Sequence, residues 1–232
     1  MNLAMAPEFQ LRVRRDEPMA KHTSWRVGGA ADVFFTPRDR DDLAAFLRAL
    51  PPATPLLWVG LGSNLLVRDG GIRGAVICTH GAFTRLERRA QLRVYCEAGV
   101  PCARLARQCA AWGLGHADFF AGIPGTLGGA LIMNAGAYGG ETWRQVRAVD
   151  VMARDGSCRT RQASEYQAAT AMSRRRPMTS GSWPRSWNSR RATPRPPAPC
   201  ASWHSAASRP SHSASGAAVR YSPIRPATTP RA

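Results

Sequence analysis

Two glycine-rich segments contain the residues best suited to hold a ligand. The first glycine loop follows the apolar run Leu57-Trp58-Val59 directly and consists of Gly60, Leu61, Gly62, Ser63, Asn64 and Leu65. Glycines at a strand end let backbone N–H groups approach a phosphate closely, and Ser63 and Asn64 add neutral donors. The loop is neither a Walker loop nor a GxGxxG fingerprint, so a tight turn without a ligand is also an open interpretation.

The second glycine loop, residues 122–129, continues into another glycine-rich stretch. Residues 122–140 contain seven glycines and no charged residue, whereas a flexible linker would be polar. Glycine in a packed segment indicates close approach to another backbone or to a flat ligand. Two such loops together predict a large, phosphate-bearing, partly apolar ligand, namely a dinucleotide. The candidate residues here are Gly122, Ile123, Pro124, Gly125, Thr126, Gly128, Gly129, Asn134, Ala135, Gly136, Ala137 and Tyr138.

The elements that position these loops alternate between strand and helix patterns. Apolar or alternating stretches predict strands at 33–35, 56–59, 75–78, 92–96 and 146–153, the last turned by Asp155-Gly156 into 157–161. Helical spacing predicts a helix over 37–50 with Thr36 as its N-cap, and a second helix from Pro101 to a stop at Gly113. The pattern predicts an α+β fold, because the strands are too irregularly interleaved for a doubly wound sheet.

Composition divides the chain near Gln167. The whole chain of 232 residues has a net charge of +17, but residues 168–232 contain 11 Arg, 10 Pro and 12 Ser, with no acidic residue, Leu or Phe. Such a segment cannot bury enough apolar surface to offset its ordering entropy, so we expect a disordered tail. The foldable part is expected to end near residue 167.

The remaining composition excludes several classes of protein. The six cysteines form no CxxC pair, so we expect them to act as small buried hydrophobic residues of a protein in the reducing cytosol. Five histidines have no metal-ligand spacing, so we expect no metal site. The first 21 residues lack the apolar run of a signal peptide, and no run is long enough to cross a membrane. We therefore expect a cytoplasmic protein with no membrane partner.

Three motifs in order carry a resemblance to a known family. The motifs GxGSNxLV from Gly60, GIPGTxGGA from Gly122 and MNAGAYGGE from Met133 resemble the UDP-N-acetylenolpyruvoylglucosamine reductases, over about residues 16–167. The segment 22–29, HTSWRVGG, is similar to the opening signature of that family. The resemblance implies the FAD-binding fold of the vanillyl-alcohol-oxidase/PCMH type, with two small α+β subdomains at 1–85 and 86–167. Another FAD-linked oxidase of the same fold is an alternative.

The resemblance also implies the chemistry. In that family NADPH reduces FAD, and the reduced flavin passes a hydride to the enolpyruvyl group of a UDP-sugar during peptidoglycan synthesis. The candidate residues of both loops would bind FAD, and Arg26 could neutralise its pyrophosphate or face solvent. The substrate-stabilising Tyr-Arg pair, the proton-donating Ser of a Gly-Ser-x-Phe-x-Asn-Pro motif and a C-terminal Glu cannot be read in this chain, so no catalytic residue is assigned.

A change of reading frame would explain this absence. Residues 168–172 can be encoded so that reading from the third base of each codon gives Gly-Tyr-Arg-His, and 218–229 then permits Gly-Ser-Val-Phe-Thr-Asn-Pro. We therefore interpret 168–232 as a frameshifted segment in place of the substrate domain, and the chain as inactive in reduction. Two alternatives remain: a sequencing error in an active reductase, and a basic nucleic-acid-binding protein whose tail, with Trp183, Trp187 and Trp203, is genuine.

Overall fold

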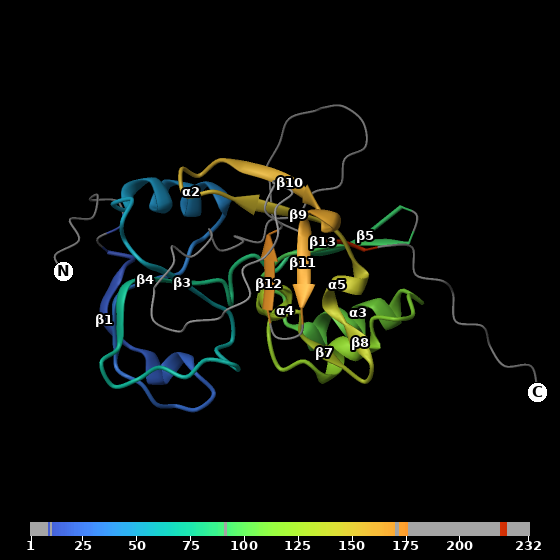
Figure 1. Ribbon diagram of the computed structural model, residues 1–232, viewed down its shortest axis with the longest axis horizontal. Coiled ribbons are helices and arrows are strands. Elements are labelled where there is room, and N and C mark those ends of the chain that lie inside the picture. Colours follow the sequence, from blue (N-terminus) through green and yellow to red (C-terminus); the bar gives the residue numbers. More distant parts are fainter. Residues whose placement is uncertain (1–8, 10, 91, 170–171, 176–218, 222–232) are drawn as a thin grey trace, which may run out of the picture.

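The computed structural model describes residues 9, 11–90, 92–169, 172–175 and 219–221, which form two lobes side by side (Figure 1). The first lobe contains strands β1 to β4 and helix α2, and the second contains the later elements. Helices and strands alternate irregularly in both lobes. The α+β class expected from the sequence is therefore confirmed.

A four-stranded sheet forms the centre of the first lobe. Its strand order is β1-β2-β4-β3, and the strands are β1 (Arg14–Pro18), β2 (Ala30–Phe35), β4 (Ile72–Cys78) and β3 (Leu56–Val59). Strand β1 is antiparallel to β2, and β2, β4 and β3 are mutually parallel. The carboxyl ends of the three parallel strands therefore share one edge of the sheet, where ligands bind in open α/β sheets.

Helix α2 (Arg40–Ala49) packs its apolar face against this sheet. The ring of Phe46 stacks on Phe35 of β2 with centroids 3.9 Å apart. The prediction that the helix starts at Pro37 with Thr36 as N-cap is wrong. Asp39 is the N-cap, because its extended backbone lets the carboxylate accept a hydrogen bond from the N–H of Asp42 at 2.8 Å.

The second lobe is built around a core to which β6, α3, α4 and β9 all contribute. Its helices are α3 (Cys102–Ala111), α4 (Leu127–Met133) and α5 (Thr142–Gln145). Its strands are β5 (Leu86–Arg89), β6 (Arg93–Cys96), β7 (Gly136–Ala137), β8 (Gly140–Glu141), β9 (Val146–Met152) and β10 (Cys158–Gln162). The second lobe also contains the 3-10 turns η2 (Asp118–Gly122) and η3 (Ala163–Glu165), whereas η1 (Met19–His22) lies between β1 and β2 in the first lobe. The predicted helix from Pro101 is confirmed as α3, with Gly113 in the left-handed region just after it.

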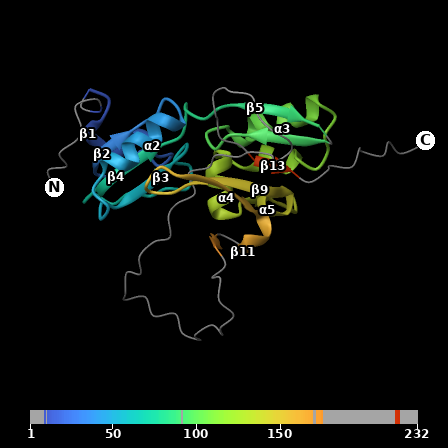
Figure 2. The same ribbon diagram turned by 90° about the horizontal axis from the view of Figure 1, so that it is seen from above.

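The hairpin β9–β10 connects the two lobes (Figure 2). Val149 packs in the core of the second lobe, whereas Met152 packs in the core of the first lobe. At the turn of the hairpin, a Cβ added to Gly156 would lie 3.0 Å from the Cβ of Ala44 in α2. The far end of this hairpin is therefore part of the first lobe, although its sequence follows that of the second.

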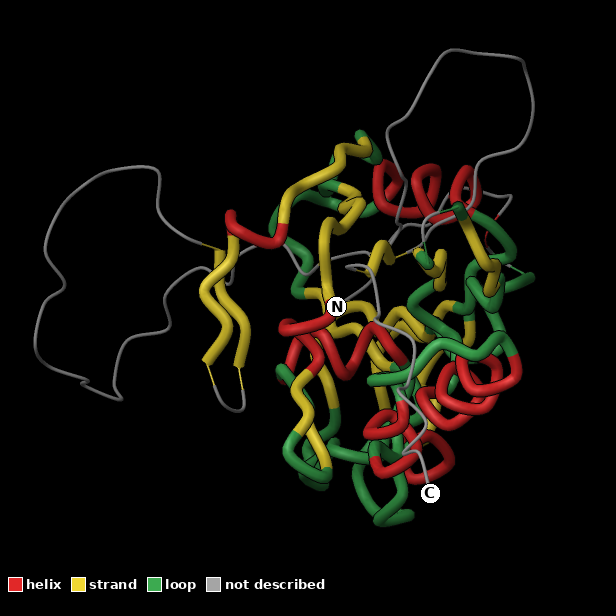
Figure 3. The backbone as a smooth tube through the Cα atoms, turned by 90° about the vertical axis from the view of Figure 1, so that its right-hand side faces the viewer, coloured by secondary structure: helices red, strands yellow, loops and turns green. Residues whose placement is uncertain are grey.

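Three short strands lie in or extend into the segment expected to be disordered. They are β11 (Tyr166–Ala169), β12 (Met172–Arg175) and β13 (Val219–Tyr221). Strands β11 and β12 pair as a hairpin at one side of the body (Figure 3), and β13 pairs antiparallel with β9. At these strands the structure differs from the expectation, because backbone hydrogen bonds between strands, within the β11–β12 hairpin and from β13 to the edge of β9, need no particular side chains. The tryptophans 183, 187 and 203 lie outside the described residues, and the frameshift interpretation stays a prediction.

Candidate cofactor site

The first glycine loop begins at the carboxyl end of β3, with Gly60 directly after Val59. Within the described residues, no backbone N–H from Leu61 to Asn64 donates a hydrogen bond, and the side chains of Ser63 and Asn64 have no hydrogen-bond partner. Four successive amides and two neutral side chains therefore have no partner at the ligand-binding edge of a parallel sheet. Such a concentration of donors suits an anion or a phosphate ester.

The segment 22–29 packs against the first glycine loop at Gly62. The N–H of Ser24 donates to the carbonyl of Gly62 at 3.2 Å. Gly62 has φ +65°, and a Cβ there would lie 1.9 Å from the carbonyl oxygen of His22, so the position requires glycine. Reasoning from the sequence found this segment only through its family resemblance, because a contact between residues 40 positions apart leaves no local pattern.

The two glycine loops contact each other. A Cβ added to Gly60 would lie 2.3 Å from Oγ1 of Thr126, and one added to Gly125 would lie 3.4 Å from Oγ of Ser63. Thr126 is buried, and its hydroxyl oxygen has no hydrogen-bond partner among the described residues. The structure therefore brings together the two loops that the sequence predicted as one site.

The amides of the second glycine loop differ from those of the first, because most of them are already bonded. Gly125 donates to Ile123 at 2.9 Å, Leu127 to Val100 at 2.9 Å and Gly128 to Ala98 at 2.9 Å. Gly128 also lies against Ala98, from which an added Cβ would be 3.0 Å away. This loop is therefore fixed to the second lobe. It contributes to the candidate site mainly through the shape of its backbone, because few of its N–H groups remain free to bind a ligand.

The predicted residues Asn134 to Tyr138 form the C-cap of α4 and the hairpin β7–β8. Asn134 caps α4 in the left-handed region, donates to Glu141 at 3.3 Å and accepts from the N–H of Trp143 at 3.1 Å. Tyr138 and Gly139 both have positive φ, as the tight turn of a hairpin requires. The glycines of this motif have structural roles that the sequence alone did not separate from ligand binding.

The hairpin also packs against the second glycine loop. A Cβ added to Gly122 would lie 2.7 Å from the Cβ of Ala137 and 2.7 Å from Cε2 of Tyr138. All three predicted segments are thus in contact, through Gly60 with Thr126 and through Gly122 with Ala137.

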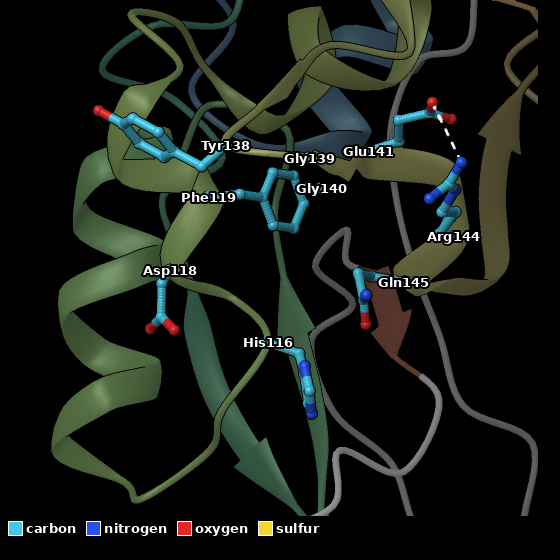
Figure 4. A pocket seen from close by; sticks show the side chains of 9 residues that line it. All are labelled: His116, Asp118, Phe119, Tyr138, Gly139, Gly140, Glu141, Arg144 and Gln145. Carbon is cyan, nitrogen blue, oxygen red and sulfur yellow. Dashed lines mark hydrogen bonds and ion pairs between the residues drawn. The ribbon is translucent and has the colours of Figure 1, made fainter. Parts of the chain in front are cut away.

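A separate hollow of about 560 Å³ lies on the other side of this hairpin (Figure 4). The Phe119 ring lies between the hairpin strands and the side chains of His116 and Asp118, while Glu141 pairs with Arg144 at 3.5 Å. Of the predicted cofactor residues only Tyr138 lines it, and its side chain points outward in Figure 4. The hollow is lined by His116, Asp118, Phe119, Tyr138, Gly139, Gly140, Glu141, Arg144 and Gln145.

Two exposed arginines are close in sequence to the first glycine loop or to its contacts. Arg26 lies two residues after Ser24, which bonds Gly62, and Arg68 lies three residues after Leu65; neither forms an ion pair within the described part of the chain. Guanidinium groups bind phosphate well, so this sequence neighbourhood suits an anionic ligand. The donor set therefore fits a dinucleotide such as FAD.

Three buried cysteines of the second lobe are held as neutral thiols. Burial raises the pKa of the Cys102 and Cys109 thiols to about 12 and raises that of Cys96 well above its ordinary value. Across the described residues, no three His, Cys, Asp or Glu side chains are grouped to hold a metal ion. The same residues contain no helix with the length and apolarity to span a bilayer.

Comparison with known proteins identifies the fold and the family. The family described as FAD binding domain matches residues 31–161, a range that includes both glycine loops and more than half of the chain. The chain belongs to this family. The solved structure of UDP-N-acetylenolpyruvylglucosamine reductase from Thermus caldophilus is similar with a TM-score of 0.60 and 30% identity, over 70% of this chain and 56% of that one. The expected FAD-binding fold is thus confirmed.

Curated relatives extend the similarity. UDP-N-acetylenolpyruvoylglucosamine reductase from Nitrosococcus oceani is 58% identical over 157 residues, which is 68% of this chain and 53% of the relative. The corresponding protein from Methylococcus capsulatus is 58% identical over 151 residues, which is 65% of this chain and 50% of the relative. The resemblance inferred from the three motifs is therefore confirmed. The chain spans about half the length of the curated relatives that it matches.

Proposed function

We propose that this chain is the FAD-binding part of an NADPH-dependent UDP-N-acetylenolpyruvoylglucosamine reductase. The observation that carries the proposal is the cluster of unbonded amides at 61–64, in a loop that contacts the second glycine loop within a domain of the FAD-binding family. The relatives at 58% identity are named as this reductase, which favours it over other FAD-linked oxidases. Its substrate would be a UDP-sugar carrying an enolpyruvyl group.

The residues of the site would act mainly by binding and orienting. The amides of Leu61 to Asn64 would donate to the pyrophosphate, with Ser63 and Asn64 beside them and Arg26 supplying positive charge. The second glycine loop would limit the position of the ligand, because its backbone is fixed to Ala98 and Val100. FAD, when bound, supplies hydride transfer, and the protein supplies orientation and exclusion of water.

We propose that the chain as written does not complete the reduction of the sugar. The last acidic residue in the sequence is Glu165, so no carboxylic acid follows the described FAD-binding lobes. A positioned general acid typically contributes roughly 10²–10⁴-fold to a rate. Stabilisation of an enolate-like intermediate adds a further factor. We also propose a cytoplasmic location, because no disulfide links the five described cysteines, as expected in a reducing compartment.

Cofactor binding tests the first part of this proposal. We expect the purified 232-residue chain to bind FAD with saturation, measured by flavin fluorescence and by equilibrium dialysis. FMN shares the flavin but lacks the adenylate half of the pyrophosphate, so we expect it to bind at least about tenfold more weakly. Equal affinity for FAD and FMN would contradict the assignment of the first glycine loop to the pyrophosphate. Absence of binding to either would contradict FAD binding by this chain.

A further inference from the structure

Arg154 lies where the strand that leaves the second lobe reaches the first. Strand β9 begins in the core of the second lobe and ends at Met152 in the core of the first, and Arg154 is two residues further on. Figures 1 and 2 both show this hairpin reaching from the second lobe across to α2. Arg154 is therefore at the junction between the lobes.

The Arg154 guanidinium binds the turn that connects α2 to β3. Its Nη2 donates to the carbonyl of Thr54 and to that of Pro51, the latter at 3.4 Å. Thr54 also donates its own N–H to Pro51 at 2.9 Å, which closes the turn. Buried Nε of Arg154 has no partner among the described residues, and burial lowers the pKa of the guanidinium. Holding a cation there costs solvation energy that only its contacts offset.

This turn and the cofactor site lie at opposite ends of one strand. Strand β3 starts two residues after Thr54 and ends next to Gly60, so a shift of the turn is transmitted to the first glycine loop. In the second lobe, β9 shares its core with Leu127 and Leu131 of α4, the helix whose first turn contains the end of the second glycine loop. The contact between Gly60 and Thr126 completes a closed ring of packed elements.

We propose that Arg154 is a positioning residue for the cofactor site: by fixing β9 to the start of β3, it sets the relative position of the two glycine loops. The inference rests on the proposed FAD site, which Arg154 does not touch. Loss of the hydrogen bonds from Arg154 to Pro51 and Thr54 leaves both lobes with their own cores but frees the first glycine loop to move relative to the second. The Kd for FAD then rises, while the free energy of unfolding of each lobe changes little.

Three variants of the 232-residue chain test this proposal. We expect Arg154→Ala to raise the Kd for FAD at least about fivefold, within the range typical of coupling between distant sites. Arg154→Lys keeps the charge and three N–H donors but loses the planar guanidinium that packs at this junction and changes the reach of the side chain, so we expect an intermediate Kd. Arg159→Ala removes an exposed arginine of the same hairpin and should leave the Kd unchanged. A Kd for Arg154→Ala within twofold of the unmodified chain would overturn the proposal.

Hydrogen exchange without FAD gives a second readout that a general loss of stability would not reproduce. We expect Arg154→Ala to speed exchange in peptides covering β3 and the Thr79 N–H, which donates to Val59 at 2.8 Å, and to leave α3 unchanged. Equal acceleration in α3 would show global destabilisation and overturn the positioning role. If the unmodified chain binds no FAD, the proposed function fails, and the exchange pattern alone then decides whether Arg154 positions β3.

Discussion

Gly60 and Thr126 meet at the boundary between the two lobes, where a Cβ on Gly60 would lie 2.3 Å from the threonine hydroxyl oxygen. Gly60 directly follows the parallel strand β3 and Thr126 is the N-cap of α4, so this contact joins the two halves of the proposed cofactor site. Any side chain at residue 60 must displace Thr126 or separate the loops.

A double-mutant cycle measures this contact. We expect Gly60→Ala to lower the free energy of unfolding by about 1–3 kcal/mol, because overpacking forces neighbouring atoms to shift. Thr126→Ala removes the hydroxyl that the new methyl group meets. In urea unfolding, the double variant should therefore lose less free energy of unfolding than the sum of the losses in the two single variants, by about 1 kcal/mol or more. Simple additivity would contradict the contact.

Gly62 should tolerate no side chain. Gly62→Val places a branched side chain at φ +65° and 1.9 Å from the backbone carbonyl of His22, which cannot move aside as a flexible side chain can. We expect a loss of about 2 kcal/mol or more in stability and the loss of bound FAD, seen as loss of yellow colour after gel filtration. Gly70→Val is the matched control, because an added Cβ there meets nothing within 4 Å. Equal FAD retention by both variants would contradict the loop assignment.

The buried cysteines should be slow to alkylate. With a pKa of about 12, Cys102 and Cys109 hold a thiolate fraction of roughly 10⁻⁴ at pH 8, and the thiolate is the reactive form. Cys158 is exposed. Mass spectrometry after brief iodoacetamide treatment at pH 8 should find Cys158 modified and Cys96, Cys102 and Cys109 unmodified. Rapid modification of Cys96, Cys102 and Cys109 in the folded chain would contradict the described core.

Glu17 should contribute to stability in a defined pH window. Burial alone would raise its pKa, but the hydrogen bond from His22 and the positive charges of Arg14 and Lys21 outweigh burial and lower the pKa. Because the pKa of Glu17 is lower in the folded state, its carboxylate stabilises the fold. This stabilisation is complete above the unfolded pKa near 4.5 and is lost as the pH falls through the lower pKa of the folded state. Glu17→Gln should therefore reduce stability at pH 7 and flatten the decline between pH 5 and about pH 3, measured by urea unfolding. A decline equally steep in the variant would exclude this role.

Periodicity in the sequence located the buried strands and α3, because their apolar residues repeat on one face. It missed β1 and β5, whose sequences RRDEP and LERR are charged, as edge strands often are. It also placed the start of α2 at Pro37, since Thr36 and Asp39 are both common N-cap residues and the sequence does not distinguish between them. The contact of Gly62 with His22 and the clamp at Arg154 join distant segments, so no local pattern could reveal them.

The reading frame decides the last expected outcome, which is turnover of the UDP-enolpyruvyl sugar. The 232-residue chain should show none, even with FAD bound, because no Tyr-Arg pair or Gly-Ser-x-Phe motif can be read in it and no carboxylic acid follows Glu165. Oxidation of NADPH in the absence of the sugar need not be lost, since that step requires only the flavin and the nicotinamide in contact. A single-base insertion or deletion near the codons of Gln167 and Ala168 that restores the other reading frame should restore turnover. A synonymous base substitution at the same codon keeps the present frame and should not. Turnover by the unmodified chain at an ordinary enzymatic rate would contradict the frameshift interpretation and would show that residues 168–232 supply the missing acid by other means.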